Sequence, residues 1–529
     1  MTTSAPSQHQ PQKITYTSAN VDLDAFHRAF DAALAEVRAR MGQSHPLHVD
    51  GEPVRPDRPP IVDVSPIDTS VVLGTFAAAG PDEVDRAVRS AKTQQRRWAA
   101  LPWRERVRIL RRAAELIRER KFLLAAIMAI EVGKNRLEAM GDAEESADLV
   151  DYYCQQVEEH DGFVRDMARL TPIEHNVETL RPYGVFACIA PFNFPLALST
   201  GMSSAALMTG NAVVYKPAED APWTGLALHD VYRDAGVPPG VFQYLSGRGR
   251  EMGDALWHHP LIDGVVFTGS KDVGMRIFHG LSERWVKPCL LELGGKNAVI
   301  VTDSADLDAA AEGVMRSAFG LQNQKCSATS RVYVYGSVAA SFAERLVERT
   351  RAIRMGDVTQ RDVWFGPVIN ERAVKRWERA VEQGAREGRL LLGGERLRGG
   401  VFDRGHFVAP TIAELPLGSG LFEEELFAPF LSVGVVSGFD EALAEANKVE
   451  YGLTAGLFSG AREEVDRFFE EVEAGVCYVN KRSGATTGAW PGAQPFCGWK
   501  GSGASGKGGC GPWYVQQFVR EQSRTVVGA

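Results

Sequence analysis

The chain has few cysteines for its length, and their spacing argues against a disulfide framework or a zinc site. Seven cysteines are scattered over 529 residues, and no two of them form a Cys-x-x-Cys pair. Small disulfide-stabilised secreted proteins are dense in cysteine, and structural zinc sites need closely spaced pairs. A sparse, odd set of cysteines therefore predicts no metal centre and is typical of a protein kept in the reducing cytoplasm.

Long hydrophobic runs, a secretory leader and an excess of positive charge are also missing. No run of about eighteen apolar residues occurs, and residues 1–20 lack the basic-then-apolar order of a signal sequence. The formal net charge of −8 opposes binding to nucleic acid or to an anionic membrane surface. We therefore expect neither a nucleic-acid partner nor a membrane segment.

Short apolar runs that alternate with amphipathic segments predict an α/β fold with parallel sheets. Strand candidates spaced by helix candidates extend from residue 185 to 293, as right-handed βαβ units require, and a second alternation extends from residue 298 to 479. Ahead of them we expect a helix over residues 23–41 and one long amphipathic helix from about residue 102 to 131. Residues 514–518 are expected to form an edge or interface strand.

Cys326 is the strongest candidate for a catalytic residue. It lies in the segment Gly320-Leu-Gln-Asn-Gln-Lys-Cys-Ser-Ala-Thr-Ser-Arg331, ahead of an apolar strand. A thiol on an apolar face is ordinarily packing, whereas a thiol that can lose its proton is a nucleophile. The amides, lysine and hydroxyl around Cys326 are a poor core environment, so the segment indicates a reactive thiol.

Two further groups suit acyl chemistry at such a thiol. Glu292 lies in Leu290-Leu-Glu-Leu-Gly-Gly-Lys296, where burial would raise its pKa towards that of a general base. A carboxylate simply paired with Lys296 is the alternative. Asn193, in Ile189-Ala-Pro-Phe-Asn-Phe-Pro195, is held between prolines directly after a strand, so its amide could serve an oxyanion. An ordinary turn asparagine is the competing interpretation.

Several loops that follow strands suit a dinucleotide. Lys216 and Glu219 follow a strand at the point where a ribose is usually bound, and Glu219 would repel a 2′-phosphate. Gly269 and Ser270 lie in a strand–turn–helix segment whose backbone N–H groups could meet a phosphate. The glycine run over residues 247–253 has the wrong spacing for a dinucleotide loop. In the acidic run at residues 423–425, the following Leu-Phe-Ala-Pro predicts that one carboxylate points inward.

In this order, the segments resemble the aldehyde dehydrogenase superfamily over residues 45–525. The resemblance implies a Rossmann-type NAD-binding domain of residues 46–163 and 184–293 and a catalytic domain of residues 294–497. It also implies an oligomerisation segment of residues 164–183 and 498–529, with a tail and helix at residues 1–45 in front. A homodimer or an assembly of dimers is expected from the same resemblance.

The resemblance also implies a role for each candidate. Cys326 would be the nucleophile that forms a thiohemiacetal and then a thioester, and Glu292 would activate the hydrolytic water. Asn193 and the Cys326 backbone N–H would hold the oxyanion. NAD is the expected cofactor, with NADP the less favoured alternative. Lys216, Glu219 and Ser270 would bind the adenosine ribose and pyrophosphate of NAD, and Glu425 would bind its nicotinamide ribose. Gly269 and Phe427 complete the expected cofactor-binding residues.

Within that family the chain resembles most the branch that oxidises L-glutamate γ-semialdehyde. In that branch two phenylalanines flank the substrate chain, and a hydroxyl with a Gly-Ala pair holds the α-carboxylate, which implies substrate contacts from Phe194, Ser327, Gly488, Ala489 and Phe496. The stretch 480–487 is longer than the branch pattern, and Cys497, Asn323 and Thr329 replace its usual residues. Oxidation of another aldehyde is therefore the main alternative, and a non-catalytic scaffold is a remote one.

Overall fold

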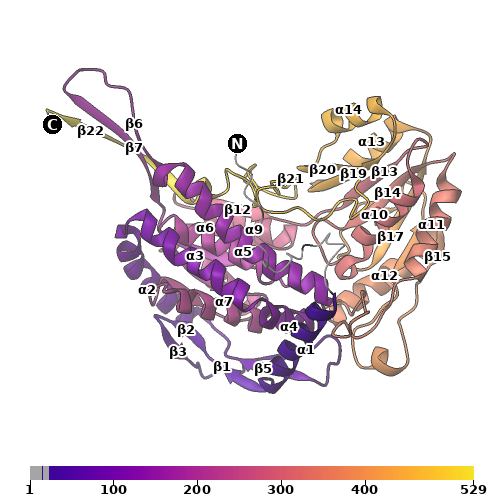
Figure 1. Cartoon of the computed structure of the whole chain (residues 1–529), viewed down its shortest axis with the longest axis horizontal. Coiled ribbons are helices and arrows are strands. Elements are labelled where there is room, and N and C mark those ends of the chain that lie inside the picture. The colour runs from indigo at the N-terminus through magenta and orange to yellow at the C-terminus, as the bar shows by residue number, and fades with distance from the viewer. Residues whose placement is uncertain (1–14, 16–22, 529) are drawn as a thin grey trace, which may run out of the picture.

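Two seven-stranded sheets flanked by helices form the body of the protein, and a three-stranded arm projects from it (Figure 1). The computed structural model describes residue 15 and residues 23–528. The expected polar tail therefore lies outside the described residues, except for Thr15. The expected helix after the tail is present as α1 (Leu23–Ala39). No helix within these described ranges is both long and apolar enough to cross a membrane.

The first sheet has the order β12-β11-β8-β9-β10-β2-β3. Its five central strands are parallel, while β2 and β3 are added antiparallel at one edge. The strands are β2 (Leu47–Val49), β3 (Glu52–Val54), β8 (Val185–Ile189), β9 (Ala212–Lys216), β10 (Phe242–Tyr244), β11 (Gly264–Thr268) and β12 (Cys289–Glu292). The five expected strands of this region are thus all present. Their near-continuous apolar sequences follow from burial on both faces.

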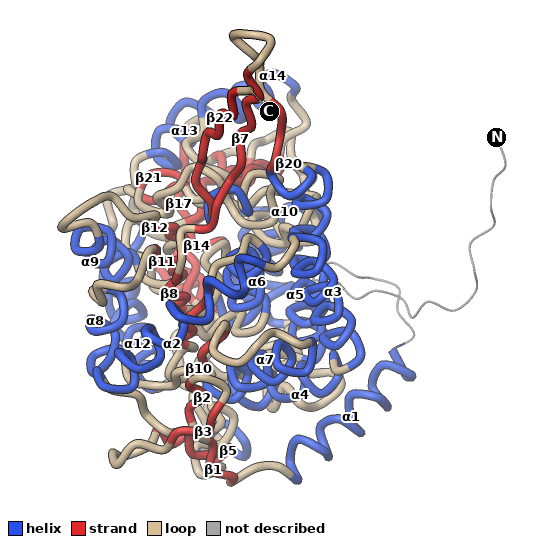
Figure 2. Tube along the Cα trace, turned by 90° about the vertical axis from the view of Figure 1, so that its left-hand side faces the viewer, coloured by secondary structure: helices blue, strands red, loops and turns tan. Residues whose placement is uncertain are grey.

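Helices cover both faces of this sheet, with α8 and α9 on one side and α6 and α7 on the other (Figure 2). The helices of this half are α2 (Pro81–Ala100), α3 (Trp103–Glu119), α4 (Lys121–Val132), α5 (Arg136–Glu159), α6 (Ala197–Met208), α7 (Pro222–Ala235), α8 (Gly249–Trp257) and α9 (Lys271–Leu281). Helix α4 ends at Gly133 and α5 begins with the side chain of Asn135 accepting the Glu138 N–H. These two ends determine where the loop between α4 and α5 enters the core.

The single long helix expected over residues 102–131 is wrong. The backbone leaves helical geometry at Arg120, which separates α3 from α4. Helix α3 buries only one face, whereas α4 is buried throughout from Leu124 onward and packs against α1, α5 and α7. Helices α3 and α4 therefore have to run in different directions to bury these faces. Their continuous apolar pattern does not reveal this change of direction.

The second sheet has the order β15-β16-β17-β14-β13-β19-β20, and only β15 is antiparallel. Its strands are β13 (Asn297–Val301), β14 (Thr329–Tyr335), β15 (Arg389–Leu392), β16 (Thr411–Glu414), β17 (Phe430–Val436), β19 (Thr454–Phe458) and β20 (Val476–Val479). Its helices are α10 (Leu307–Phe319), α11 (Ala339–Arg351), α12 (Glu371–Glu387), α13 (Phe439–Asn447) and α14 (Arg462–Glu471). This second α/β unit was expected, although β15, β16, β19, α12 and α14 were not.

The projecting arm pairs β7 (Glu174–Pro182) with β6 (Val164–Asp166) and with β22 (Val519–Val527). The strand expected at residues 514–518 is wrong, because the short helix η5 (Val515–Phe518) occupies it. Phe518 packs on Phe186, with ring centroids 5.0 Å apart, and Tyr514 stacks on Tyr153 at 5.4 Å. These aromatic side chains are needed in the core, so pairing starts only afterwards, at β22.

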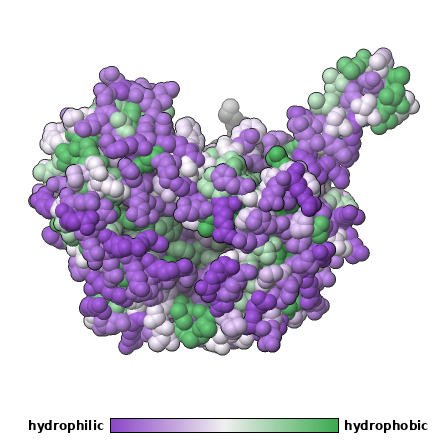
Figure 3. Space-filling view, turned by 180° about the vertical axis from the view of Figure 1, so that it is seen from behind, coloured by the Kyte–Doolittle hydropathy of each residue, from purple (hydrophilic) through white to green (hydrophobic). Residues whose placement is uncertain are grey.

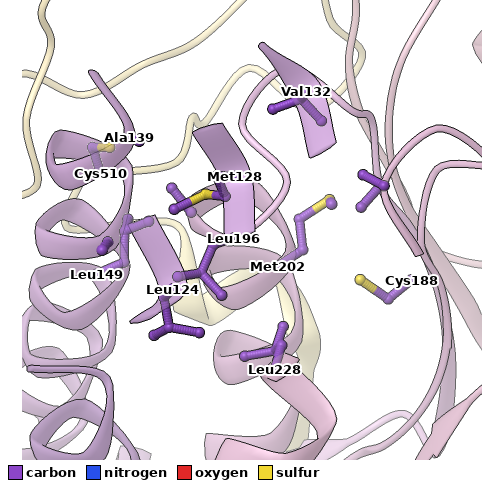
Figure 4. Close-up of a cluster of buried hydrophobic side chains, with 14 of the residues drawn as sticks. Leu124, Met128, Val132, Ala139, Leu149, Cys188, Leu196, Met202, Leu228 and Cys510 are labelled. Atoms are coloured by element: carbon purple, nitrogen blue, oxygen red, sulfur yellow. The ribbon is translucent and has the colours of Figure 1, made fainter. Parts of the chain in front are cut away.

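Smaller elements complete the described chain. One group forms a three-stranded sheet and a two-stranded ribbon: β1 (Gln43–His45), β4 (Ile61–Val64), β5 (Val72–Phe76), β18 (Tyr451–Gly452) and β21 (Trp499–Lys500). Four short 3-10 turns are η1 (Asp161–Phe163), η2 (Gly320–Asn323), η3 (Gly400–Asp403) and η4 (Gly420–Phe422). Figure 4 shows the buried core where α4, α5 and α6 meet, with Met128, Leu149 and Met202 facing one another.

Candidate active site

A large cleft opens at the carboxyl ends of β8 and β11. These two strands are neighbours, yet the chain proceeds outward from them in opposite directions, through β9 and β10 on one side and to β12 on the other. Open α/β sheets bind ligands at such a switch point. The cleft has a volume of about 910 Å³ and includes Ile189 at the end of β8 and Thr268 at the end of β11. The cleft therefore lies where the loop sequences predict a dinucleotide site.

Most of the residues expected at a dinucleotide lie together in this cleft. Its lining includes Asn193, Lys216, Gly269, Ser270, Cys326, Glu425 and Phe427. Glu219 stands beside it, with Oε1 accepting the backbone N–H of Gly249, which does line the cleft. The glycine run at residues 247–253, which has the wrong spacing for a dinucleotide loop, thus contributes to the wall all the same. Spacing rules describe a turn within one loop, whereas this wall is formed by the start of α8.

Glu425 is the one carboxylate of its acidic run that points inward. Glu423 and Glu424 are exposed, while Oε1 of Glu425 accepts the backbone N–H of Gly295 at 3.0 Å. A Cβ atom at Gly294 would lie 2.0 Å from the Glu425 carboxylate, so any larger residue there would displace that carboxylate. Burial raises the pKa of Glu425 to about 7, against the opposing effect of the Gly295 N–H and of Lys296 and Arg376. The carboxyl group is thus held rigidly at the edge of the cleft.

The loop before Cys326 has an unusual backbone. Leu321, Gln322 and Asn323 all have positive φ angles, of 47°, 54° and 61°. Such conformations are costly for side chains other than glycine and persist where the surroundings enforce them. Asn323 Nδ2 donates to the carbonyls of Ala318 and Thr329, so an asparagine at this position holds both sides of the loop.

The polar residues around Cys326 are buried, in contrast to the usual placement of such side chains. Gln322 and Gln324 are fully buried, and Gln324 Oε1 accepts the Ile369 N–H at 2.9 Å. Lys325 Nζ lies 2.6 Å from Glu138 Oε1, so a salt bridge to α5 balances the charge of Lys325. The polar sequence therefore reflects a hydrogen-bonded frame around the thiol.

The Cys326 thiol and the Glu292 carboxyl group both have raised pKa values, so each tends to keep its proton. Burial raises the pKa of Cys326 to about 12, helped by the charges of Glu292 and Glu425 and opposed by the backbone N–H groups of Ser327 and Cys326. Burial also raises the pKa of Glu292 well above its usual range, and its Oε2 atom has no hydrogen-bond partner among the described residues. At neutral pH the Cys326 thiol therefore carries its proton, and it must lose that proton before it can act as a nucleophile.

A second cavity, of about 170 Å³, reaches Cys326, which lines both spaces. We call it the tunnel. Its walls include every residue expected at the substrate, together with the expected base: Phe194, Glu292, Ser327, Gly488, Ala489 and Phe496. Met202, Leu149 and Cys510 also line it, so the tunnel borders the apolar core of Figure 4. The thiol thus stands where the cleft and the tunnel meet.

Four residues that support the site were not foreseen. Asn297 Nδ2 donates to the carbonyls of Cys326 at 2.7 Å and of Ala328 at 2.8 Å. On α5 and the loop before it, Lys134 Nζ lies 2.5 Å from Asp142 Oδ2, and Glu138 Oε2 accepts the Leu321 N–H. Only the Lys-Asn pair after Gly294-Gly295 could have drawn attention to Asn297. The α5 residues are far from the loops in sequence and carry no motif.

In the described part of the chain, no group of three His, Cys, Asp or Glu side chains could hold a metal ion. The site offers a thiol where the two cavities meet, an amide donor in the cleft and a carboxyl group in the tunnel. Such a set can form a covalent adduct with a carbonyl carbon, stabilise its oxyanion and then hydrolyse an acyl group.

A model of the aldehyde dehydrogenase family matches residues 54–523. The chain belongs to the aldehyde dehydrogenase family. The expected family and its α/β fold are thereby confirmed. The 1-pyrroline-5-carboxylate dehydrogenase of Geobacillus sp. (strain WCH70) is 36% identical, over 98% of this chain and 99% of the relative.

Two solved structures of the family are similar over most of the chain. A 1-pyrroline-5-carboxylate dehydrogenase from Thermus, solved with bound NAD, gives a TM-score of 0.91 at 36% identity, covering 98% of this chain and 100% of that one. A 3,6-anhydro-L-galactose dehydrogenase gives a TM-score of 0.85 at 30% identity, covering 91% of this chain and 100% of that one. The two enzymes are named for different substrates, so the shared fold does not by itself select the substrate.

Proposed function

We propose that this aldehyde dehydrogenase oxidises L-glutamate γ-semialdehyde, the open form of 1-pyrroline-5-carboxylate, to L-glutamate with NAD. The observation that carries the proposal is the composition of the tunnel, where Phe194 and Phe496 stand with Ser327 and the Gly488–Ala489 pair around the thiol. Two aromatic side chains suit an aliphatic chain, and a hydroxyl with backbone N–H groups suits a carboxylate. The relatives named for this substrate support the same choice. Such a reaction belongs to proline breakdown.

In this proposal the Cys326 thiol releases its proton to water, and the resulting thiolate attacks the aldehyde carbon to form a thiohemiacetal. The developing oxyanion accepts hydrogen bonds from the Asn193 amide and the Cys326 backbone N–H, and one such donor is typically worth about 3–4 kcal/mol. After oxidation to the thioester, Glu292 takes a proton from water, which attacks the acyl carbon and releases the thiol. The raised pKa of Glu292 suits a group that must accept and return a proton in each cycle.

NAD would lie in the cleft and would supply the acceptor for the hydride that leaves the thiohemiacetal. Lys216 and Glu219 would bind the adenosine ribose, Gly269 and Ser270 the pyrophosphate, and Glu425 the nicotinamide ribose, with Phe427 beside it. The residues present suit this ligand, because the buried Lys216 has as its described hydrogen-bond partner only the carbonyl of the next residue, Pro217. Glu219 would disfavour the 2′-phosphate of NADP.

The domain division and assembly are proposed in the same way. Each large sheet lies within one of the proposed domains, residues 46–163 with 184–293 and residues 294–497, and the strands of the arm come from the proposed oligomerisation segments, residues 164–183 and 498–529. The arm exposes apolar side chains at Met167, Leu170 and Ile173, and Figure 3 shows hydrophobic surface at the tip of the arm. A homodimer, or an assembly of dimers, would cover them. All seven cysteines are free, which supports the cytoplasm as the location.

A panel of aldehydes tests the substrate. NADH formation is measured with glutamate γ-semialdehyde beside aliphatic and aromatic aldehydes that lack an α-carboxylate, and we expect the highest kcat/KM for glutamate γ-semialdehyde. A much higher value for an aldehyde without the carboxylate refutes the proposal. The long stretch 480–487 favours a second candidate, a different aldehyde on the same catalytic groups, and the same panel identifies it.

A further inference from the structure

The long loop that follows β20 carries a lysine that no catalytic role uses. Lys481 Nζ lies 2.5 Å from the carbonyl oxygen of Thr487 and 3.3 Å from that of Gly488, and it stands 3.9 Å above the ring of Tyr478. Burial lowers the pKa of Lys481 to about 8, so the ammonium is charged at neutral pH. One cation therefore holds two consecutive carbonyl groups immediately beside the tunnel.

The orientation of these two peptides follows from their geometry. In a trans peptide the N–H points opposite to the C=O, so the N–H groups of Gly488 and Ala489 face away from Lys481. In an extended strand, successive carbonyl groups point to opposite sides. Gly488 instead has a φ of 90°, and this turn brings the carbonyls of Thr487 and Gly488 to the same side of the chain. Neither N–H donates to an acceptor among the described residues. Since Gly488 and Ala489 line the tunnel, two unpaired N–H groups are available there.

The rest of the loop is fixed independently of Lys481. Asn480 exchanges hydrogen bonds with the backbone of Ser459, and the Ala485 N–H donates to Gly313. The buried Thr486 hydroxyl donates to the carbonyl of Ser327 at 2.6 Å, next to the nucleophile. Removal of the Lys481 ammonium should therefore disturb the two peptides more than the loop as a whole.

We propose that Lys481 is a positioning residue for substrate specificity, which orients the Gly488 and Ala489 N–H groups so that they bind the carboxylate of an anionic aldehyde. The proposal rests on the proposed function for the identity of that aldehyde, but the cradle itself needs only a carboxylate. Consecutive N–H groups on one side of the chain form an anion-binding concavity, and the ammonium behind their carbonyls strengthens its positive potential.

The test compares Lys481→Met and Lys481→Arg with Arg482→Met as the matched control. Arg482 is the next residue, and its exposed side chain forms an ion pair with Glu312 at 2.6 Å outside the tunnel. Steady-state kinetics are measured with glutamate γ-semialdehyde, with succinate semialdehyde as a carboxylate that is one carbon shorter and lacks the amino group, and with pentanal as an uncharged aldehyde. Inhibition by L-glutamate reports binding without turnover, and thermal unfolding checks that each variant folds.

For Lys481→Met we expect KM for the carboxylate-bearing aldehydes, and the inhibition constant of L-glutamate, to rise about tenfold, which corresponds to about 1.4 kcal/mol. Turnover of pentanal should stay within about twofold. Lys481→Arg should restore most of the loss, and Arg482→Met should behave as the parent. An equal loss on pentanal, or unchanged KM values for both carboxylates, overturns the inference. If the parent enzyme prefers succinate semialdehyde and Lys481→Met removes that preference, the inference stands and glutamate γ-semialdehyde is not the substrate.

Discussion

Replacement of Asp142 by Asn should destabilise the protein strongly, because it leaves the Lys134 ammonium buried without a counter-charge. Both side chains are fully buried, and Lys134 Nζ lies 2.5 Å from Asp142 Oδ2. Burial raises the pKa of Asp142 and lowers that of Lys134, so each group keeps its charge only through the other. Loss of one partner of a buried pair costs about 3–5 kcal/mol. A Coulomb attraction of about 4 kcal/mol, for charges about 4 Å apart at an effective dielectric constant of about 20, agrees with that range.

The pair also contacts the active site. Asp142 Oδ1 accepts the Ala197 N–H at 2.7 Å, at the start of α6, and Lys134 Nζ lies 3.9 Å from the ring centre of Phe194. An asparagine can still accept the Ala197 N–H, so Asp142→Asn tests the charge rather than the helix start. We expect a higher KM for the aldehyde as well, because Phe194 loses a fixed neighbour.

Urea unfolding followed by fluorescence and circular dichroism measures the effect. Asp142→Asn should lower the midpoint markedly, and the double variant with Lys134→Met should recover most of the loss. Asp466→Asn is the matched control, since it removes the acid of an exposed helical pair with Arg462 and should leave the midpoint unchanged. If Asp142→Asn behaves like Asp466→Asn, or if the double variant loses the sum of both single losses, the buried pair is not what holds this region.

The remaining predictions concern the catalytic groups and one buried acid. Cys326→Ala should abolish NADH formation while NAD binding, followed by fluorescence titration, persists; substantial turnover would contradict the nucleophile role. Glu292→Gln should slow deacylation, so that an acyl-enzyme appears in intact-mass spectra, and an unchanged steady-state rate would count against the base. Asn193→Ala should lower kcat by about 10²–10³, measured with saturating aldehyde; a change below about threefold would exclude an oxyanion donor. Burial raises the pKa of Glu131 from 4.5 to about 7. Between these two pH values the native state keeps a proton that the unfolded state has released. The stability that this proton contributes is lost as the pH rises through about 7. Glu131→Gln should flatten the pH dependence of the urea midpoint between about pH 5 and pH 8, and an unchanged slope would refute this assignment.

The alternating apolar pattern predicted the five parallel strands of the first sheet and four of the seven strands of the second, because parallel strands are buried on both faces. Such burial gives continuous apolar runs of the kind seen at Val185–Ile189 and Asn297–Val301. The pattern failed where the ends and the type of an element depend on the direction in which its side chains pack rather than on the periodicity of the sequence. The break at Arg120 and the helical turn at Val515–Phe518 both depend on which neighbours the side chains meet. No local sequence signal encodes those neighbours.

The candidate site divides in a similar way. The sequence alone determined which residue types were available, because Cys326, Glu292 and Asn193 each lie in a short segment with an evident chemical use. Only the tertiary structure decided that these segments meet where a large cleft joins a smaller tunnel. It also decided that Lys325 is paired with Glu138, and that Lys481 holds the carbonyls behind Gly488. The physical reason is that reactivity depends on side-chain chemistry within a loop, whereas positioning depends on hydrogen bonds between segments far apart in the chain.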